Sequence, residues 1–160
     1  MNPPIDISGF PTGGPEVEYD EAEQLEGLPV LQADALAYAQ AFRSTPVVRD
    51  VVLAFGIAPM LGLFLVRFAT PITRGELAGE TEVWVVVGDL PFMCFETDDA
   101  RSPARALELY CAIAQDWAEA VLSGRDLSES YPIAIEPTAE HAEMLLSRID
   151  FIRDEFVPLA

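Results

Sequence analysis

Residues 82–91 read Glu-Val-Trp-Val-Val-Val-Gly-Asp-Leu-Pro, and the first seven of them decide the fold. Valine and tryptophan favour β-strands, and this run is apolar on both of its alternating faces. A strand of that kind is typical of the centre of a sheet that is covered on both sides. Asp89-Leu90-Pro91 then turns the chain, because Pro91 has no N–H to donate to a ladder.

Two further strands are expected beside this one. Residues 61–68 (Leu-Gly-Leu-Phe-Leu-Val-Arg-Phe) are short, aromatic and branched, and residues 92–97 follow the Pro91 turn directly. Pro71, Gly75 and Gly79 mark a long polar loop between residues 61–68 and 82–88. The sequence therefore predicts a small antiparallel sheet of about three strands.

Helices are predicted on either side of the sheet segment. Ser102 is a suitable N-cap and Gly124 a suitable stop for a helix over residues 103–123, which carries one apolar stripe. A last helix is expected over residues 138–156.

Two more helices are expected before the sheet. Residues 31–43 are rich in alanine and other helix formers. Thr45-Pro46 supplies an N-cap followed by proline for a shorter helix over residues 46–56, although its valines are weak helix formers. Together these elements predict an α+β fold in which helices pack on the sheet.

The N-terminal segment differs in composition from the rest. Residues 1–27 are rich in proline, glycine and carboxylates and hold no basic side chain, so they are predicted to form a flexible acidic tail. Residues 28–160 are then expected to form a single domain, as the chain length of 160 residues also suggests.

The charge balance excludes several classes of partner. The chain has 27 carboxylates against nine basic residues, all of them arginine, for a formal net charge of -18. Binding to nucleic acid or to an anionic membrane needs clustered basic side chains, so neither is expected. Residues 75–160 hold eighteen of the carboxylates and five of the arginines, which places the predicted acidic surface there.

Location and redox state follow from other segments. Residues 1–6 show neither a basic nor an apolar signal region, so we expect a cytoplasmic protein. Residues 51–66 carry no charge, but they are shorter than a membrane span and are interrupted by Gly56, Pro59 and Gly62. Cys94 and Cys111 are too few and too far apart for a disulfide framework or a zinc site, and both are expected to be buried thiols.

Residues 57–124 resemble an uncharacterised bacterial family of small intracellular α+β proteins, a domain of unknown function. The resemblance rests on Ala58-Pro59, on residues 84–91 (Trp-Val-Val-Val-Gly-Asp-Leu-Pro) and on the helix opening at residues 102–107. It implies a small bacterial α+β domain, and it implies no activity, cofactor or catalytic residue.

Asp98 and Asp99 form the most suggestive polar pair. Adjacent carboxylates at a strand end can bind a divalent cation. They can also take different pKa values, so that one acts as a general acid and the other as a general base. The simpler interpretation, which we favour, is that they precede the 103–123 helix and stabilise its positive N-terminal end. No metal or cofactor is therefore predicted, and the pair stays an alternative metal or catalytic site.

The remaining candidates are single residues. Asp89 is expected to stabilise a turn, with a ligand-binding role as the alternative. His141 is expected to be an exposed helical histidine, although a general-base role is open to it. Trp84 and Trp117 are expected in the core or in the lining of a ligand pocket.

These observations favour a non-enzymatic module that binds a protein partner, most simply a basic one, by analogy with toxin-neutralising immunity proteins. The alternative is a small enzyme or ligand-binding domain with Asp89, Asp98, Asp99 and His141 gathered around an apolar pocket. The sequence leaves the oligomeric state open, and an exposed apolar patch would allow a homo-oligomer.

Overall fold

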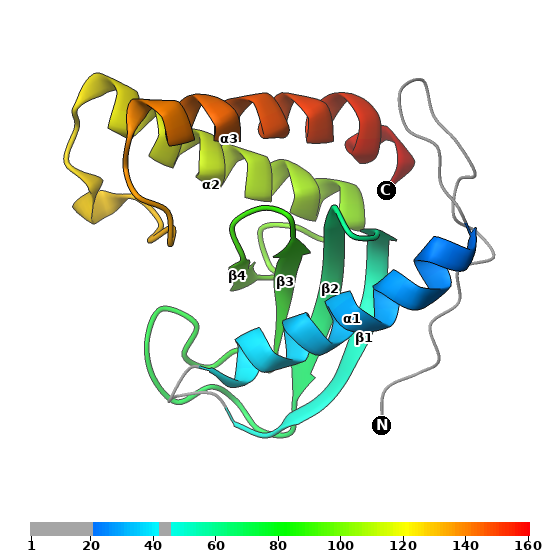
Figure 1. The fold of residues 1–160 in the computed structure, drawn as a ribbon. Helices are drawn as coiled ribbons and strands as arrows, with labels where there is room; N and C mark the ends of the chain where they lie inside the picture. Colours follow the sequence, from blue (N-terminus) through cyan, green and yellow to red (C-terminus); the bar gives the residue numbers. More distant parts are fainter. Residues whose placement is uncertain (1–20, 42–45) are drawn as a thin grey trace.

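The fold is a four-stranded antiparallel sheet with helices on both faces. The computed structural model describes residues 21–41 and 46–160. Its main elements are α1 (Glu21–Gln40), β1 (Val48–Ile57), β2 (Leu61–Phe68), β3 (Glu82–Gly88), β4 (Met93–Glu96), α2 (Pro103–Ser123) and α3 (Ala139–Phe151). The strands form a meander in the order β1-β2-β3-β4, which confirms the predicted α+β class (Figure 1).

The valine-rich stretch is an inner strand, as its sequence predicts. In β3, Val83, Val85 and Val87 are buried in the core under α1. Trp84 and Val86 point the other way, into the core under α2 and α3. The two-residue period of a strand thus divides one apolar run between two cores.

The predicted boundaries of the later elements are confirmed. β2, β3 and β4 match the expected strands, and Gly75 and Gly79 adopt positive φ in the loop between β2 and β3. The side chain of Ser102 accepts from the backbone N–H of Arg105 at the start of α2, and Gly124 ends this helix with a φ of 71°. Thr138 caps α3, which continues beyond residue 151 as a π-helical turn over Ile152–Phe156.

The prediction of a helix over residues 46–56 is wrong, because most of this segment forms β1. Val51 pairs with Val66 and Val52 with Leu65 in the β1–β2 hairpin. β-Branched side chains lose rotamer freedom in a helix and pack well on a pleated sheet, and this preference outweighed the Thr45-Pro46 capping signal. Thr45 lies outside the described residues.

Helix α1 begins earlier than predicted. Residues 21–27, which the sequence placed in the tail, form its first turns, while residues 1–20 lie outside the described residues. Pro29 lies inside this helix and is exposed, so the carbonyl it leaves without a partner can bond to water. The buried positions of the helix are Gln24, Leu28, Leu31, Ala35 and Ala39.

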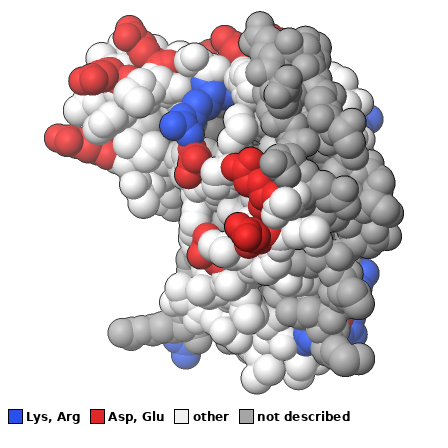
Figure 2. All heavy atoms as spheres, turned by 45° about the vertical axis from the view of Figure 1, so that its right-hand side comes forward, with Lys and Arg blue, Asp and Glu red and all other residues white. Residues whose placement is uncertain are grey.

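The surface charge of the described residues is only partly neutralised. Ion pairs engage Arg49, Arg67, Arg101, Arg125 and Arg153. Acidic side chains gather on the helical layer and near the middle of the face shown in Figure 2. In the part of the chain that the structure describes, no helix is both long and apolar enough to cross a membrane.

A candidate binding cleft along the edge of β4

A cleft of about 780 Å³ runs along the outer edge of β4. The end of α1, the β2–β3 loop, β4, α2 and the loop after α2 all contribute to its walls. Its apolar lining comes from Ala39, Phe68, Ile72, Leu77, Cys94, Phe95, Leu109, Ile113 and Pro132. Its polar lining comes from Arg74, Glu76, Glu96, Asp99, Ser128, Ser130 and Tyr131.

Two tyrosines cover the edge of β4, and one of them, Tyr131, also lines the cleft. The hydroxyl of Tyr131 accepts from the backbone N–H of Cys94 and donates to the Cys94 carbonyl, both at 3.1 Å. The hydroxyl of Tyr38 donates to the carbonyl of Phe92 at 3.4 Å, and its ring meets the Phe92 ring edge-on. Burial, the largest cause, raises the pKa of both phenols, so both remain protonated donors at neutral pH.

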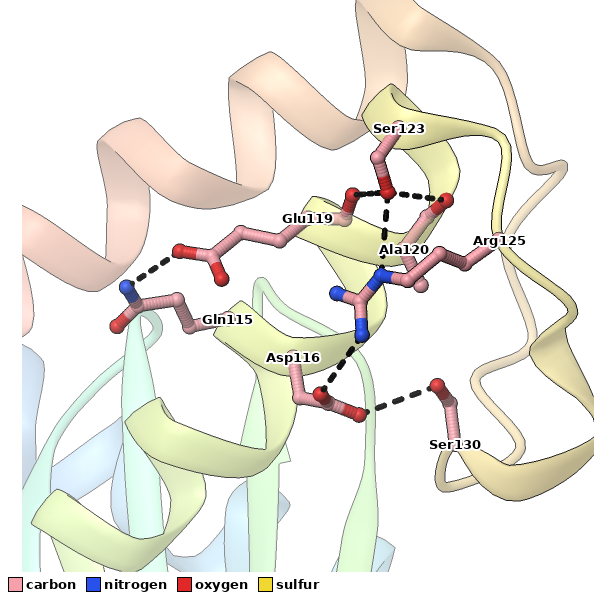
Figure 3. Close-up of polar contacts among 7 residues, drawn as sticks. All are labelled: Gln115, Asp116, Glu119, Ala120, Ser123, Arg125 and Ser130. Carbon is pink, nitrogen blue, oxygen red and sulfur yellow. Dashed lines mark hydrogen bonds and ion pairs between the residues drawn. The ribbon is translucent and has the colours of Figure 1, made fainter.

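The loop that carries Tyr131 is held to α2 by polar contacts (Figure 3). Ser130 donates to Asp116 at 3.1 Å, and Arg125 lies 4.0 Å from the same carboxylate. The Arg125 guanidinium also donates to Ser123 at 3.1 Å. These groups are largely exposed, so their contacts position the loop without contributing much stability.

Carboxylates gather at one end of the cleft. One oxygen each of Glu80, Glu96 and Asp98 lies within 4.8 Å of the others, a spacing that could hold a metal ion. Partial burial, followed by the nearby charges of Asp99, Glu80 and Asp98, raises the pKa of Glu96. Arg101 pairs with Asp98 at 3.6 Å.

The two residues of the predicted Asp98–Asp99 pair therefore have different neighbours. Both side chains are exposed in the turn before α2. Asp98 faces Glu80 and Glu96, which the sequence prediction did not include in the metal alternative, whereas Asp99 lines the cleft. Glu80 is 18 residues earlier in the chain than Asp98, and the antiparallel pairing of β3 with β4, in which Val83 lies opposite Glu96, brings them together.

Asp89 lies elsewhere, in the exposed turn after β3. Its backbone N–H donates to the carbonyl of Met60 at 3.0 Å. Gly88, with a φ of 132°, permits this approach, because a Cβ there would lie 2.3 Å from the Met60 oxygen. Asp89 also lines a second cavity of about 400 Å³, together with Arg148 and apolar residues of α3.

His141 belongs to neither cavity. Its backbone N–H donates to Thr138 at the start of α3, and its Nδ1 lies 3.0 Å from the carbonyl of Glu136. Asp89, the Asp98–Asp99 pair and His141 thus occupy three separate places among the described residues, so the pocket that the enzyme alternative required is not formed by them.

The tryptophans and cysteines are core residues. Trp84 and Trp117 are buried in the core under α2 and α3, and the Trp84 indole N–H donates to the carbonyl of Ala100 at 2.8 Å. Cys94 and Cys111 are buried free thiols, as predicted, and burial raises the pKa of each to about 12. Neither tryptophan lines either cavity.

No protein-family model, curated protein or solved structure matches this chain. The resemblance over residues 57–124 therefore stays a prediction, and the function has to be argued from the cleft itself. Neither Tyr38 nor Tyr131 is among the site residues that the sequence predicts. The one available signal was Tyr131 itself, an aromatic residue directly before Pro132 in the segment between α2 and α3.

Proposed function

We propose that the protein is a non-enzymatic binding module that holds a basic segment of a partner protein in the cleft along β4. The observation that carries this proposal is the combination of an apolar floor with carboxylates at one end of a cavity of about 780 Å³. A pocket with apolar walls and a few convergent polar groups is the usual form of a binding site.

The carboxylates favour a cationic ligand. The raised pKa of Glu96 reflects partial burial first and then the repulsion of neighbouring acids, and a bound cation would offset that repulsion. Among the described residues that line the cleft, Arg74 is the one cationic side chain, and it is exposed on the β2–β3 loop. The net charge of -18 adds long-range attraction for a basic partner.

The apolar floor suits the same kind of ligand. Lysine and arginine bury their aliphatic stems against apolar surface while the charged group stays in a polar setting. Phe68, Ile72 and Phe95 would contact such a stem, and the charged group would meet Glu96 and Asp99. A short segment with basic and aliphatic side chains therefore matches the cleft better than a compact polyanion or a neutral lipid.

A calorimetric titration tests this function. The probe is a seven-residue peptide that alternates arginine with valine, and a peptide that alternates glutamate with valine is the negative control. We expect binding of the basic peptide only, with an affinity that falls as salt screens the carboxylates. The double variant Glu96→Gln with Asp99→Asn should bind the basic peptide about fivefold to tenfold more weakly.

A second double variant controls for net charge. Glu140→Gln with Glu143→Gln removes the same two charges from exposed positions of α3 that do not line the cleft. Its affinity should equal that of the parent protein within about twofold. An equal loss in both double variants, or no binding of the basic peptide to the parent, would contradict the proposal.

A further inference from the structure

At the outer edge of β4, the side chain of Tyr131 makes the hydrogen bonds that a neighbouring strand would otherwise make. In an antiparallel ladder, a residue at a hydrogen-bonded position exchanges both its N–H and its C=O with one residue of the next strand. Cys94 exchanges both groups with the single hydroxyl of Tyr131, each at 3.1 Å. The phenol thus occupies the place that a backbone partner would take.

The same edge continues on both sides of Cys94. Backbone groups of alternate residues point to the same side of a strand, so Phe92 and Glu96 face outward with Cys94. The carbonyl of Phe92 accepts from Tyr38 at 3.4 Å, which agrees with this orientation. At the other end, Glu96 and Asp99 bring carboxylates to the edge.

The other edge of the sheet is arranged differently. There the carbonyl of Val51 in β1 accepts from the side chain of Gln32 at 3.0 Å, and Gln32 belongs to α1. A long helix that packs on the sheet is difficult to displace. The cap on β4 is instead half-buried and lies on a loop with exposed anchoring contacts.

We propose that an extended basic segment adds to β4 as a fifth strand and displaces the hydroxyl of Tyr131. This inference rests on the proposed function and specifies how the partner is held. The exchange replaces two hydrogen bonds at Cys94 by two others, so the displacement itself has a small net cost. Main-chain bonds then provide affinity, and alternate side chains of the partner meet the apolar floor and the carboxylates.

The first test changes only the peptide. The arginine–valine peptide is compared with two derivatives, one methylated at the backbone nitrogens of its valines and one at those of its arginines. Successive N–H groups of a strand point to opposite edges, so only one derivative loses the bonds to β4. We expect that derivative to bind at least roughly tenfold more weakly, with the other close to the parent peptide.

The second test changes only the cap. Tyr131→Phe leaves the Cys94 groups without their partner in the free protein, so the peptide should bind roughly tenfold more tightly. Tyr110→Phe is the matched control, because its hydroxyl also donates to a backbone carbonyl, that of Pro91 at 2.9 Å, but Tyr110 does not line the cleft. Its peptide affinity should equal that of the parent protein.

The outcomes separate the two proposals. If the basic peptide binds the parent but both methylated derivatives bind equally, or if Tyr131→Phe weakens binding, strand addition is wrong and the acidic cleft stands. If neither the parent nor Tyr131→Phe binds the peptide, the proposed function fails as well. A doubled mass of Tyr131→Phe in light scattering, without peptide binding, would show that the edge pairs with a second copy and overturn the basic segment as its occupant.

Discussion

The two faces of the sheet are covered to different extents. One face lies under α2 and α3, which pack side by side, and its core contains both tryptophans and the largest set of buried side chains. The other face lies under α1 alone, with a smaller core of valines, leucines and phenylalanines. The cleft opens at the edge of β4, where the two coverings end.

Because of this difference, we expect different parts of the molecule to determine its stability and its ligand binding. On the face under α2 and α3, the two helices pack against each other. A cavity left by a truncated side chain there cannot be filled by a shift of one helix unless the other helix moves too. A single helix covers less of the opposite face and leaves room at the sheet edge for tyrosines, carboxylates and a ligand. We therefore expect substitutions to cost most on the two-helix face and to change binding mainly at the β4 edge.

The largest effects should come from truncating a leucine on each face. Leu107 of α2 and Leu28 of α1 are both fully buried. Leu107→Ala should lower the free energy of unfolding by about 3–5 kcal/mol, and Leu28→Ala by about 2–3 kcal/mol, because α1 can shift into its cavity. Urea unfolding measures both.

Exposed leucines of the same helices provide the controls. Leu122→Ala in α2 and Leu25→Ala in α1 should each change the free energy of unfolding by less than about 0.5 kcal/mol. Equal costs for Leu28→Ala and Leu107→Ala would show that the one-helix face is as rigid as the other.

An intermediate effect is expected at the polar contact that fixes α1. Gln24 is 4% exposed, accepts from the N–H of Ala58 at 2.8 Å and donates to its carbonyl at 3.1 Å. Gln24→Ala leaves both buried groups without partners and should cost about 2–3 kcal/mol in urea unfolding. Gln32→Ala removes one partly buried bond of the same helix and should cost about 1 kcal/mol. If Gln24→Ala were the milder substitution, this contact would not anchor α1.

The two faces also differ in how well their sequences predict them. α2 was predicted to its boundaries, because Ser102, Gly124 and one apolar stripe are local signals. α1 was predicted only in part. Its buried stripe starts at a glutamine and includes two alanines, and Gly27 and Pro29 interrupt the pattern. Local propensity therefore placed the start of the helix at residue 31, whereas tertiary packing extends it back to Glu21.

The cleft was largely beyond prediction for a related reason. Asp98 and Asp99 were identified from their adjacency in the chain. Glu96 is two residues before Asp98, but Glu80 and Tyr131 come near this end of β4 only through the β3–β4 pairing and the loop after α2, and contacts over such separations leave no periodic signal in one sequence.

The smallest expected effect tests whether the carboxylates at the end of β4 repel one another in the folded protein. Glu96 follows Cys94 by two residues, so its side chain lies on the α1 face of β4. Its pKa is raised in the folded protein, so this state binds the proton more tightly than the unfolded chain does. Stability therefore falls as the pH rises through the interval between the unfolded pKa and the raised pKa.

Glu96→Gln removes that penalty. Its melting temperature should exceed that of the parent by a few degrees at about pH 8, and the difference should shrink towards about pH 4, where the parent carboxyl is protonated. Glu140→Gln is the opposite control, because Glu140 lies in the first turn of α3 and its charge favours the helix N-terminus. That variant should melt slightly lower at about pH 8. If Glu96→Gln were no more stable than the parent protein at any pH, the carboxylates of the parent would already be neutralised without a ligand. The proposal of a basic partner would then lose its electrostatic basis.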